Sequence, residues 1–423
     1  MPLIPAVEIG SLMSELHFCF LQGMPSPFFS RIARTLSAAG HRVTAIHLSP
    51  GDQLFWKGGA SVSYRGTKRG WTRFLSRFLR EEKVTHLLLL GERRKYHNVA
   101  VPLAREMGIE VIVTDFGYIR SGWMTLEREG MNGASLLPRD LTVLHELARQ
   151  APPIEFNQPY RDSDFRMACN DLLYSFSNVL FRWLYPFYQR SDTRPHPLLY
   201  FPSMGWQLLR RGRMRLQTEE RLAACLTKSG PFYVMPLQLE HDFQIVSYCS
   251  YPDLGLAVRE VISSFARQAP VSAQLLIKVH PWDPGLRNWS LDIEQWAAEA
   301  GVTGRVHFFE GGSLDDIIRA SRGMIVINST SGMRALQLGC PVKLLGQAVY
   351  DVPGLAFGGT LDEFWTDATC PPQADIDAFF RALVATTQIP GVFFTSPGLD
   401  RAVSSAVERI LSGTVGRLPP GSC

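Results

Sequence analysis

Short apolar runs alternate with longer amphipathic stretches in two separate parts of the chain, and this alternation most limits the folds available. In the first part we predict strands at 17–21, 42–48, 84–90 and 109–114 and helices at 28–39, 70–82 and 97–107. In the second part we predict strands at 232–236, 273–279, 305–309, 323–327 and 342–345 and helices at 253–267, 290–300, 313–321, 332–338 and 374–386. Such alternation favours parallel sheets with helices on both faces.

The 423 residues are enough for two domains with their own cores. We therefore predict an α/β protein with two Rossmann-like domains facing a cleft. The expected units are an N-terminal domain at 1–160, a helical bridge at 161–228, a C-terminal domain at 229–390, and a last helix with a tail at 391–423. The region 115–160 is expected to have less regular structure than the part before it, and the Pro/Gly-rich tail to be disordered. This plan is similar to the GT-B glycosyltransferase fold, an analogy that does not give a function.

Charge and cysteine content exclude several classes of protein. The net charge of +4 gives no reason to expect a nucleic-acid partner. Basic residues gather at 65–80 and 210–215, where they suit an anionic lipid or substrate, or form an ordinary solvated helix face. The seven cysteines are scattered, odd in number and without a CxxC pair, which favours a reducing compartment and no metal site.

No apolar run reaches the roughly 18 residues that a membrane span needs. The run from Leu172 to Tyr188 is interrupted by Arg182 and predicts a buried or interfacial helix. No signal-peptide pattern is visible. We therefore expect a cytoplasmic protein that contacts the inner membrane from that side.

Polar clusters follow three predicted strands of the second half. The first contains Gln238, Glu240 and Asp242, and the second contains Lys278, His280 and Pro281. The third consists of the consecutive residues Asn328, Ser329, Thr330, Ser331 and Gly332. In open parallel sheets, ligands bind at the carboxyl ends of the strands, so the three clusters predict one site.

Each cluster also has an ordinary structural interpretation. Hydroxyl side chains before a helix favour a bound phosphate, but they also cap helices. A lysine and a histidine on one face of a strand would balance a phosphate charge, although histidines at strand ends are commonly structural. A carboxylate after the first strand would act on an anomeric carbon, or only cap a turn.

The first half adds candidates for an acceptor side. Gln22 and Gly23 begin a loop after the first strand, and Asp115 and Tyr118 follow a later strand. Glu127 lies in a polar and aromatic stretch that suits a carbohydrate, or that forms a surface Ω-loop.

These motifs together resemble the KpsS/LipB family of capsule polysaccharide biosynthesis and export proteins, nearly from end to end. The motifs that carry the resemblance are FLQG and PFF within 20–29, GDQLFW at 51–56, YRG at 64–66, GERRKYH at 91–97, GYIRSGWMTLEREGMNG at 117–133, LPRD at 137–140, PLQLEHDFQI at 236–245, KVHPWD at 278–283, NSTSG at 328–332 and GCPVKLLGQAVYDVPGL at 339–355.

The resemblance implies a retaining β-Kdo transferase that uses CMP-Kdo, needs no other cofactor, and begins a Kdo linker on a phosphatidylglycerol-type lipid. It implies work at the inner membrane beside a KpsC-like transferase and the capsule exporter. It also implies that Asp242 is the nucleophile, with Gln238 upstream, and that the His280–Pro281 pair and Ser329 to Ser331 lie at the CMP. From residue chemistry we expect a second carboxylate, Glu127 or Glu240, to be the base for the incoming hydroxyl.

Two departures affect the acceptor side. A Glu-Glu-Gly-Tyr pattern is replaced by Asp115-Phe116-Gly117-Tyr118, and an Arg-Pro pair by Arg120-Ser121. Residue chemistry alone also leaves other functions open. A transferase for another CMP-linked 2-keto acid such as sialic acid, a sugar-nucleotide epimerase, or a non-catalytic export subunit would fit the same clusters.

Overall fold

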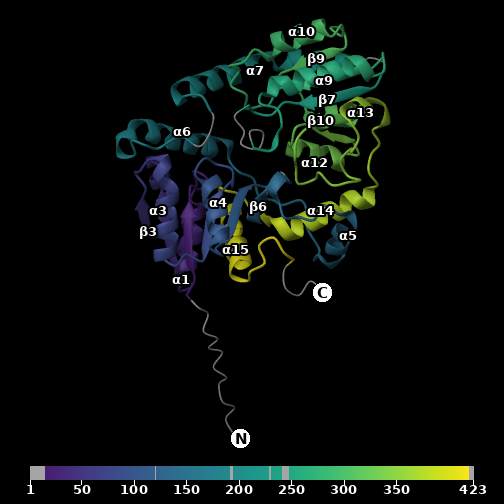
Figure 1. The fold of residues 1–423 in the computed structure, drawn as a ribbon. Helices are drawn as coiled ribbons and strands as arrows, with labels where there is room; N and C mark the ends of the chain where they lie inside the picture. Colours follow the sequence, from purple (N-terminus) through teal and green to yellow (C-terminus); the bar gives the residue numbers. More distant parts are fainter. Residues whose placement is uncertain (1–14, 120, 191–193, 228–229, 241–246, 419–423) are drawn as a thin grey trace.

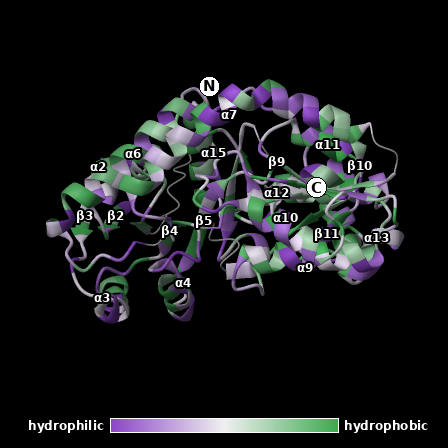
Figure 2. Cartoon of the chain, turned by 90° about the horizontal axis from the view of Figure 1, so that it is seen from above, coloured by the Kyte–Doolittle hydropathy of each residue, from purple (hydrophilic) through white to green (hydrophobic). Residues whose placement is uncertain are grey.

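The chain forms two α/β lobes, each built on its own sheet and joined by long helices (Figure 1). The structure is a computed structural model, and it describes residues 15–119, 121–190, 194–227, 230–240 and 247–418. The predicted class, two Rossmann-like domains with a helical bridge, is confirmed. Figure 2 shows hydrophobic strands inside both lobes and more hydrophilic helices outside them.

The N-terminal lobe has a seven-stranded sheet in the order β12-β6-β5-β4-β1-β2-β3. Its strands are β1 (His17–Leu21), β2 (Arg42–His47), β3 (Ala60–Ser63), β4 (His86–Leu90), β5 (Glu110–Phe116), β6 (Trp123–Arg128) and β12 (Gln388–Pro390). Its helices are α1 (Phe28–Ala38), α2 (Pro50–Phe55), α3 (Lys68–Glu81), α4 (His97–Glu106), the short 3₁₀ helix η1 (Asn132–Ala134), α5 (Leu141–Gln150) and α15 (Gly398–Leu411). Strands β1 to β5 are parallel, and β6 and β12 are each antiparallel to the neighbour that precedes them along the chain.

The C-terminal lobe has a five-stranded parallel sheet in the order β11-β10-β7-β8-β9. Its strands are β7 (Phe232–Pro236), β8 (Gln274–Lys278), β9 (Val306–Phe309), β10 (Ser321–Val326) and β11 (Val342–Leu344). Its helices are α9 (Leu254–Gln268), α10 (Trp289–Glu299), α11 (Leu314–Ala320), α12 (Thr330–Gln337) and α13 (Leu361–Asp367), and α14 (Gln373–Thr387) follows them along the chain.

The helical bridge connects the two lobes along the chain and is composed of α6 (Asp164–Leu180), the short 3₁₀ helix η2 (Arg182–Leu184) and α7 (Pro197–Leu226). The predicted apolar helix at 172–188 ends earlier, at Leu180. None of the helices in the described ranges is long and apolar enough to cross a bilayer.

The end of the chain returns to the N-terminal lobe, which the sequence analysis did not anticipate. Helix α14 packs on α5, β12 pairs with β6, and α15 packs on α1. The expectation of a disordered tail is wrong for residues 413–418, because Val415 is fully buried in the core formed with α1 and α15. The region 115–160 is also more regular than expected, since it contains β6 and α5.

Candidate functional site

Three neighbouring strands of the C-terminal lobe bring the predicted clusters to one edge of the sheet. Strand β7 lies between β10 and β8, and all three are parallel. Gln238 follows β7, and its Nε2 donates to Asn328 Oδ1 at 2.9 Å, while Asn328 N donates back to Gln238 Oε1 at 3.2 Å. The first and third clusters therefore touch, as the strand order requires.

The third cluster forms the capped start of α12. Ser329 is the N-cap, and its Oγ accepts from Ser331 N at 3.2 Å and from Ser331 Oγ at 2.8 Å. Thr330 is the first helical residue. Gly332 is packed so closely that an added Cβ would lie 2.2 Å from the Tyr350 hydroxyl. The cap accounts for Ser329 and Ser331, and the helix dipole directs partial positive charge to the same place.

The second cluster places a lysine in the protein interior. Lys278 is only 6 % exposed, and its Nζ reaches one backbone oxygen, that of Val279, at 3.5 Å. It forms no ion pair with any carboxylate in the described ranges. Burial lowers the pKa of Lys278, and the charge of Arg211 lowers it further. Two cations thus lie together at the strand end, and the carboxylates of Glu310 and Asp283 act on Arg211 there.

Arg211 on α7 is the residue that sequence reasoning missed here, since it counted only as part of the basic patch at 210–215. Its guanidinium donates to the backbone oxygen of Pro281 at 2.6 Å.

The neighbouring His280 is held by the turn that follows the strand. Its Nδ1 accepts from Trp282 N at 3.1 Å, so the neutral ring carries its proton on Nε2.

The predicted nucleophile cannot be placed. Asp242 lies in 241–246, outside the described residues. Glu240, at the edge of that range, is ion-paired with Arg287 at 2.8 Å.

In the N-terminal lobe, Glu127 on β6 is fully buried, and both of its carboxyl oxygens accept hydrogen bonds. The Tyr118 hydroxyl donates to Oε1 at 2.6 Å, and the Ser135 hydroxyl donates to Oε2. Burial raises the pKa of Glu127 from 4.5 to about 8, and the charge of Glu92 adds to the rise. A carboxyl that is mostly protonated at neutral pH is a poor proton acceptor, so the geometry favours a positioning role over the predicted role as base.

Glu92, at the end of β4, is a second buried acid beside Glu127. The hydroxyl of Tyr248, from the C-terminal lobe, donates to Glu92 Oε1, and Arg93 Nε donates to that hydroxyl at 3.0 Å. Burial raises the pKa of Glu92. These contacts join the two lobes through a buried polar group.

Asn132 extends this junction to the donor-side clusters. Its backbone N donates to the Tyr118 hydroxyl at 2.5 Å, its Oδ1 accepts from Val349 N at 3.0 Å, and its Nδ2 approaches Asn328 O at 3.5 Å. One network therefore brings together four predicted residues from both lobes, which are Tyr118, Glu127, Gln238 and Asn328. Asp115 at the end of β5 is outside these contacts, and its Oδ1 accepts from Phe116 N at 2.8 Å.

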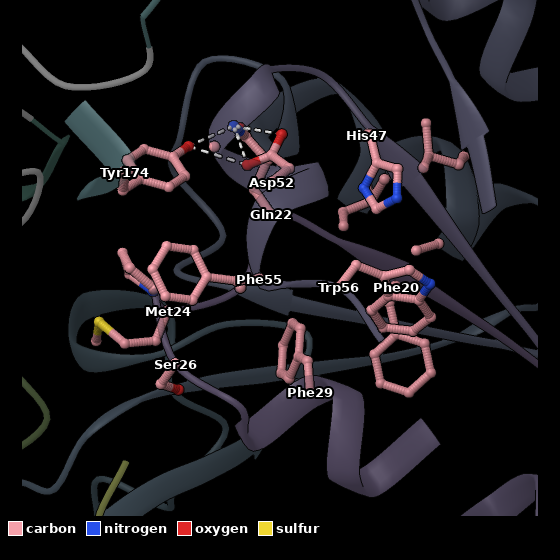
Figure 3. A pocket seen from close by; sticks show the side chains of 16 residues that line it. Phe20, Gln22, Met24, Ser26, Phe29, His47, Asp52, Phe55, Trp56 and Tyr174 are labelled. Atoms are coloured by element: carbon pink, nitrogen blue, oxygen red, sulfur yellow. Dashed lines mark hydrogen bonds between the residues drawn. The ribbon is translucent and has the colours of Figure 1, made fainter. Parts of the chain in front are cut away.

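Gln22 and Gly23 lie elsewhere, in a small cavity of about 30 Å³ at the ends of β1 and β2 (Figure 3). Gln22 Nε2 lies 3.3 Å from both carboxylate oxygens of Asp52, and Tyr174 from α6 donates to Asp52 Oδ1 at 2.9 Å. Burial raises the pKa of Asp52, and the backbone N–H of Leu48 opposes the rise. An added Cβ at Gly23 would lie 2.6 Å from the Phe29 ring.

Asp52 and Tyr174 were missed as partners of Gln22, although the GDQLFW motif contains Asp52. The detectable signal is the sequence Ser49-Pro50-Gly51-Asp52, a capping box that begins α2. Ordinary capping explains two of the hydrogen bonds to Asp52, those from the backbone N–H groups of Leu48 and Ser49. The contact to Tyr174 is long-range and could not be found from spacing.

The described residues include no group of three or more His, Cys, Asp or Glu side chains suited to a metal ion. A second cavity, of about 510 Å³, lies between α7, α10 and β9 and is lined by none of the predicted site residues.

Comparison with known proteins settles the family. A family profile described as "Capsule polysaccharide biosynthesis protein" matches residues 85–394. The chain belongs to this family. It is 31 % identical over 396 residues to "Capsule polysaccharide modification protein LipB" of Neisseria meningitidis serogroup A, covering 91 % of this chain and 93 % of that protein. It is 27 % identical over 386 residues to "Capsule polysaccharide export protein KpsS" of Escherichia coli, covering 90 % and 98 %.

The predicted membership of the KpsS/LipB family is thus confirmed. Among solved structures, "Thermosulfurimonas dismutans KpsC, beta Kdo 2,7 transferase" is 15 % identical, with 93 % of this chain and 99 % of that chain covered and a TM-score of 0.44. A likeness at this level carries no argument about function. The family profile covers the residues of the inter-lobe network in both lobes. It begins at residue 85, so it does not include Gln22 and Asp52.

Proposed function

We propose that this capsule biosynthesis protein is a retaining β-Kdo transferase. It moves Kdo from CMP-Kdo to a phosphatidylglycerol-type lipid and so begins the Kdo linker of a capsular polysaccharide. We place it on the cytoplasmic side of the inner membrane, working with a KpsC-like transferase and the capsule exporter.

The observation that carries the proposal is the buried Lys278 beside Arg211 at the end of β8, on the same sheet edge as the start of α12 and separated from it by β7. Among the described residues Lys278 has no carboxylate partner, and a buried cation in that state is unfavourable because burial removes its hydration. A nucleotide monophosphate between these cations and the start of α12 would offset that cost. CMP carries one phosphate and Kdo one carboxylate, so a CMP-Kdo donor brings two anionic groups to this place.

The chemistry then needs a carboxylate at the anomeric carbon. In the proposed first step, the Asp242 carboxylate forms a bond to that carbon, the bond to the phosphate oxygen breaks, and CMP leaves with the bonding electrons. In the second step, the acceptor hydroxyl oxygen displaces Asp242 and gives up its proton. Two inversions give net retention. Gln238, fixed by Asn328, is a positioning residue four residues before Asp242.

The two candidates for the base differ in environment. Glu127 is enclosed and hydrogen-bonded at both oxygens, so we assign it the task of holding Tyr118 and the loop that carries Asn132. Glu240 is partly exposed and held by Arg287. We therefore propose Glu240 as the proton acceptor.

Release of CMP from CMP-Kdo in the presence of lysophosphatidylglycerol tests the proposal. We expect Asp242→Asn and Asp242→Ala to abolish release while CMP still binds in calorimetry. Asp367→Asn, an exposed position on α13, is the matched control and should behave as wild type. Near-normal turnover by both Asp242 variants would remove this residue from the role, and equal use of CMP-linked sialic acid would contradict the assigned donor.

A further inference from the structure

Large apolar side chains are exposed along the bridge far more than elsewhere. Of 22 exposed large hydrophobic residues in the described ranges, 13 lie at 165–190 and 194–216. They include Trp183, which is 73 % exposed, Trp206, which is 63 % exposed, and Leu216, which is 73 % exposed. Scattered exposed apolar residues are normal, but a concentration of this kind marks an interaction surface. We refer to the exposed side chains of these two ranges as the bridge face.

The apolar residues of α7 form a stripe. Leu198, Pro202, Leu209 and Leu216, with Arg213 among them, recur at spacings that put them on one side of a helix, and all are exposed. The buried residues Tyr200, Met204, Leu222 and Cys225 lie on other sides of the helix. With 30 residues, α7 is about 45 Å long. Figure 2 shows α6 and α7 along one outer edge of the molecule.

Positive charge accompanies this apolar surface. The two ranges contain eight arginines and one aspartate, whereas the net charge of the whole chain is only +4. Arg210 forms an ion pair with Glu310, and Arg211 donates a hydrogen bond to the Pro281 oxygen. These two arginines of the predicted basic patch therefore contact the C-terminal lobe. Arg166, Arg182 and Arg213 are exposed, and none of them is ion-paired with a residue that the structure describes.

Helix α6 connects the bridge face with the interior of the N-terminal lobe. Its Tyr174 closes the cavity over Asp52, whereas Leu173 and Leu180 are exposed. Phe181 and Trp183 continue the exposed apolar surface beyond the end of the helix. A partner surface in contact with the bridge face would therefore be separated from the ends of β1 and β2 by α6.

We propose that the bridge face docks on an anionic lipid surface, with its tryptophans and leucines in the headgroup region and Arg166, Arg182 and Arg213 against lipid phosphates. Exposed Trp and Leu with arginine alongside is the composition of an interfacial helix. A second copy of this chain fits less well, because it would bring like charges together. The inference deepens the proposed function and rests on it for the identity of the lipid acceptor.

Vesicle flotation of the full chain tests the docking surface. Wild-type protein should bind vesicles of phosphatidylcholine with phosphatidylglycerol, and bind less as salt rises or when phosphatidylglycerol is omitted. The variant with Trp206→Ser, Leu209→Ser and Leu216→Ser should lose at least about tenfold in binding, because three apolar side chains no longer insert. Val271→Ser, an 88 % exposed position in the C-terminal lobe, is the matched control.

Quenching by brominated lipid locates the contact independently. Of the nine tryptophans, four are buried, including Trp71, Trp289 and Trp365, and three are half-buried. Quenching should therefore come chiefly from Trp183 and Trp206, which are exposed. It should fall strongly in the variant with Trp183→Phe and Trp206→Phe. Unchanged quenching would overturn the proposal.

The activity assay separates this proposal from the proposed function. The triple serine variant should release CMP at the wild-type rate with a short-chain lysophosphatidylglycerol kept monomeric, and be slower only with vesicles. No vesicle binding by wild type, or full binding by the triple variant, would refute docking even if the soluble acceptor is used. A change of assembly state in the triple variant, with vesicle binding intact, would assign the face to a protein contact. No turnover of either acceptor by wild type would contradict the transferase proposal alone.

Discussion

The pKa of Glu127 predicts an unusual pH dependence of stability. In the folded protein its pKa is raised from 4.5 to about 8, so between these values the folded state keeps a proton that the unfolded state has released. Stability must therefore fall as pH rises through this window, by about 1.4 kcal/mol per pH unit for one proton. Below the unfolded value, both states are protonated and the penalty vanishes.

Glu127→Gln removes this titration and preserves the shape of the site. The amide oxygen can accept from Tyr118 as Oε1 does, and the amide nitrogen can donate to the Ser135 hydroxyl. From pH 5.5 to pH 8, the stability of the variant relative to wild type should rise by about 3 kcal/mol. Glu92 is present in both proteins, so its own titration cancels to first order.

Urea unfolding of both proteins at several pH values between 5.5 and 8.5 measures this difference. Glu106→Gln is the control, because Glu106 is an exposed residue of α4, and its curve should run parallel to that of wild type. Parallel curves for Glu127→Gln would show that Glu127 is ionised at neutral pH in the folded state, and would restore it as a candidate base.

Two further variants probe the donor side. Gly332→Ala should destabilise the protein by about 1–3 kcal/mol and weaken CMP binding, because its Cβ would lie 2.2 Å from the buried Tyr350 hydroxyl. Gly358→Ala is the control. It has open space around it and should change neither thermal unfolding nor CMP binding. Lys278→Met should weaken CMP binding at least about tenfold in calorimetry. It should leave stability equal or higher, since it removes a buried cation that has no carboxylate partner among the described residues. Wild-type CMP affinity in Lys278→Met, or weakened affinity in the Lys343→Met control on β11, would contradict the assigned phosphate position.

Periodicity predicted most of the central strands because they are short, continuous apolar runs. β1 and β7 begin and end at the predicted residues, and β8 to β11 lie within two residues of their predicted limits. What escaped prediction depends on contacts distant in sequence. β12 has three residues, and only its pairing with Thr125 and its neighbours on β6 makes it a strand.

The candidate site was likewise predictable where it depends on strand order, but not where it depends on contacts between segments distant in sequence. That Gln238, Lys278 and Asn328 gather at one edge follows from strand order. The link through Asn132 and Tyr248 did not follow, because it depends on how the two lobes meet. Arg211 was assigned to a surface patch, since a helix of 30 residues does not reveal from its sequence which arginine turns inward.

Mass spectrometry of lysophosphatidylglycerol after incubation with CMP-Kdo and the purified protein measures the proposed transfer itself. We predict that the lipid gains Kdo, that one CMP is released for each Kdo transferred, and that Asp242→Asn gives neither product. An unmodified lipid, with wild-type protein that is folded and binds CMP, would contradict it.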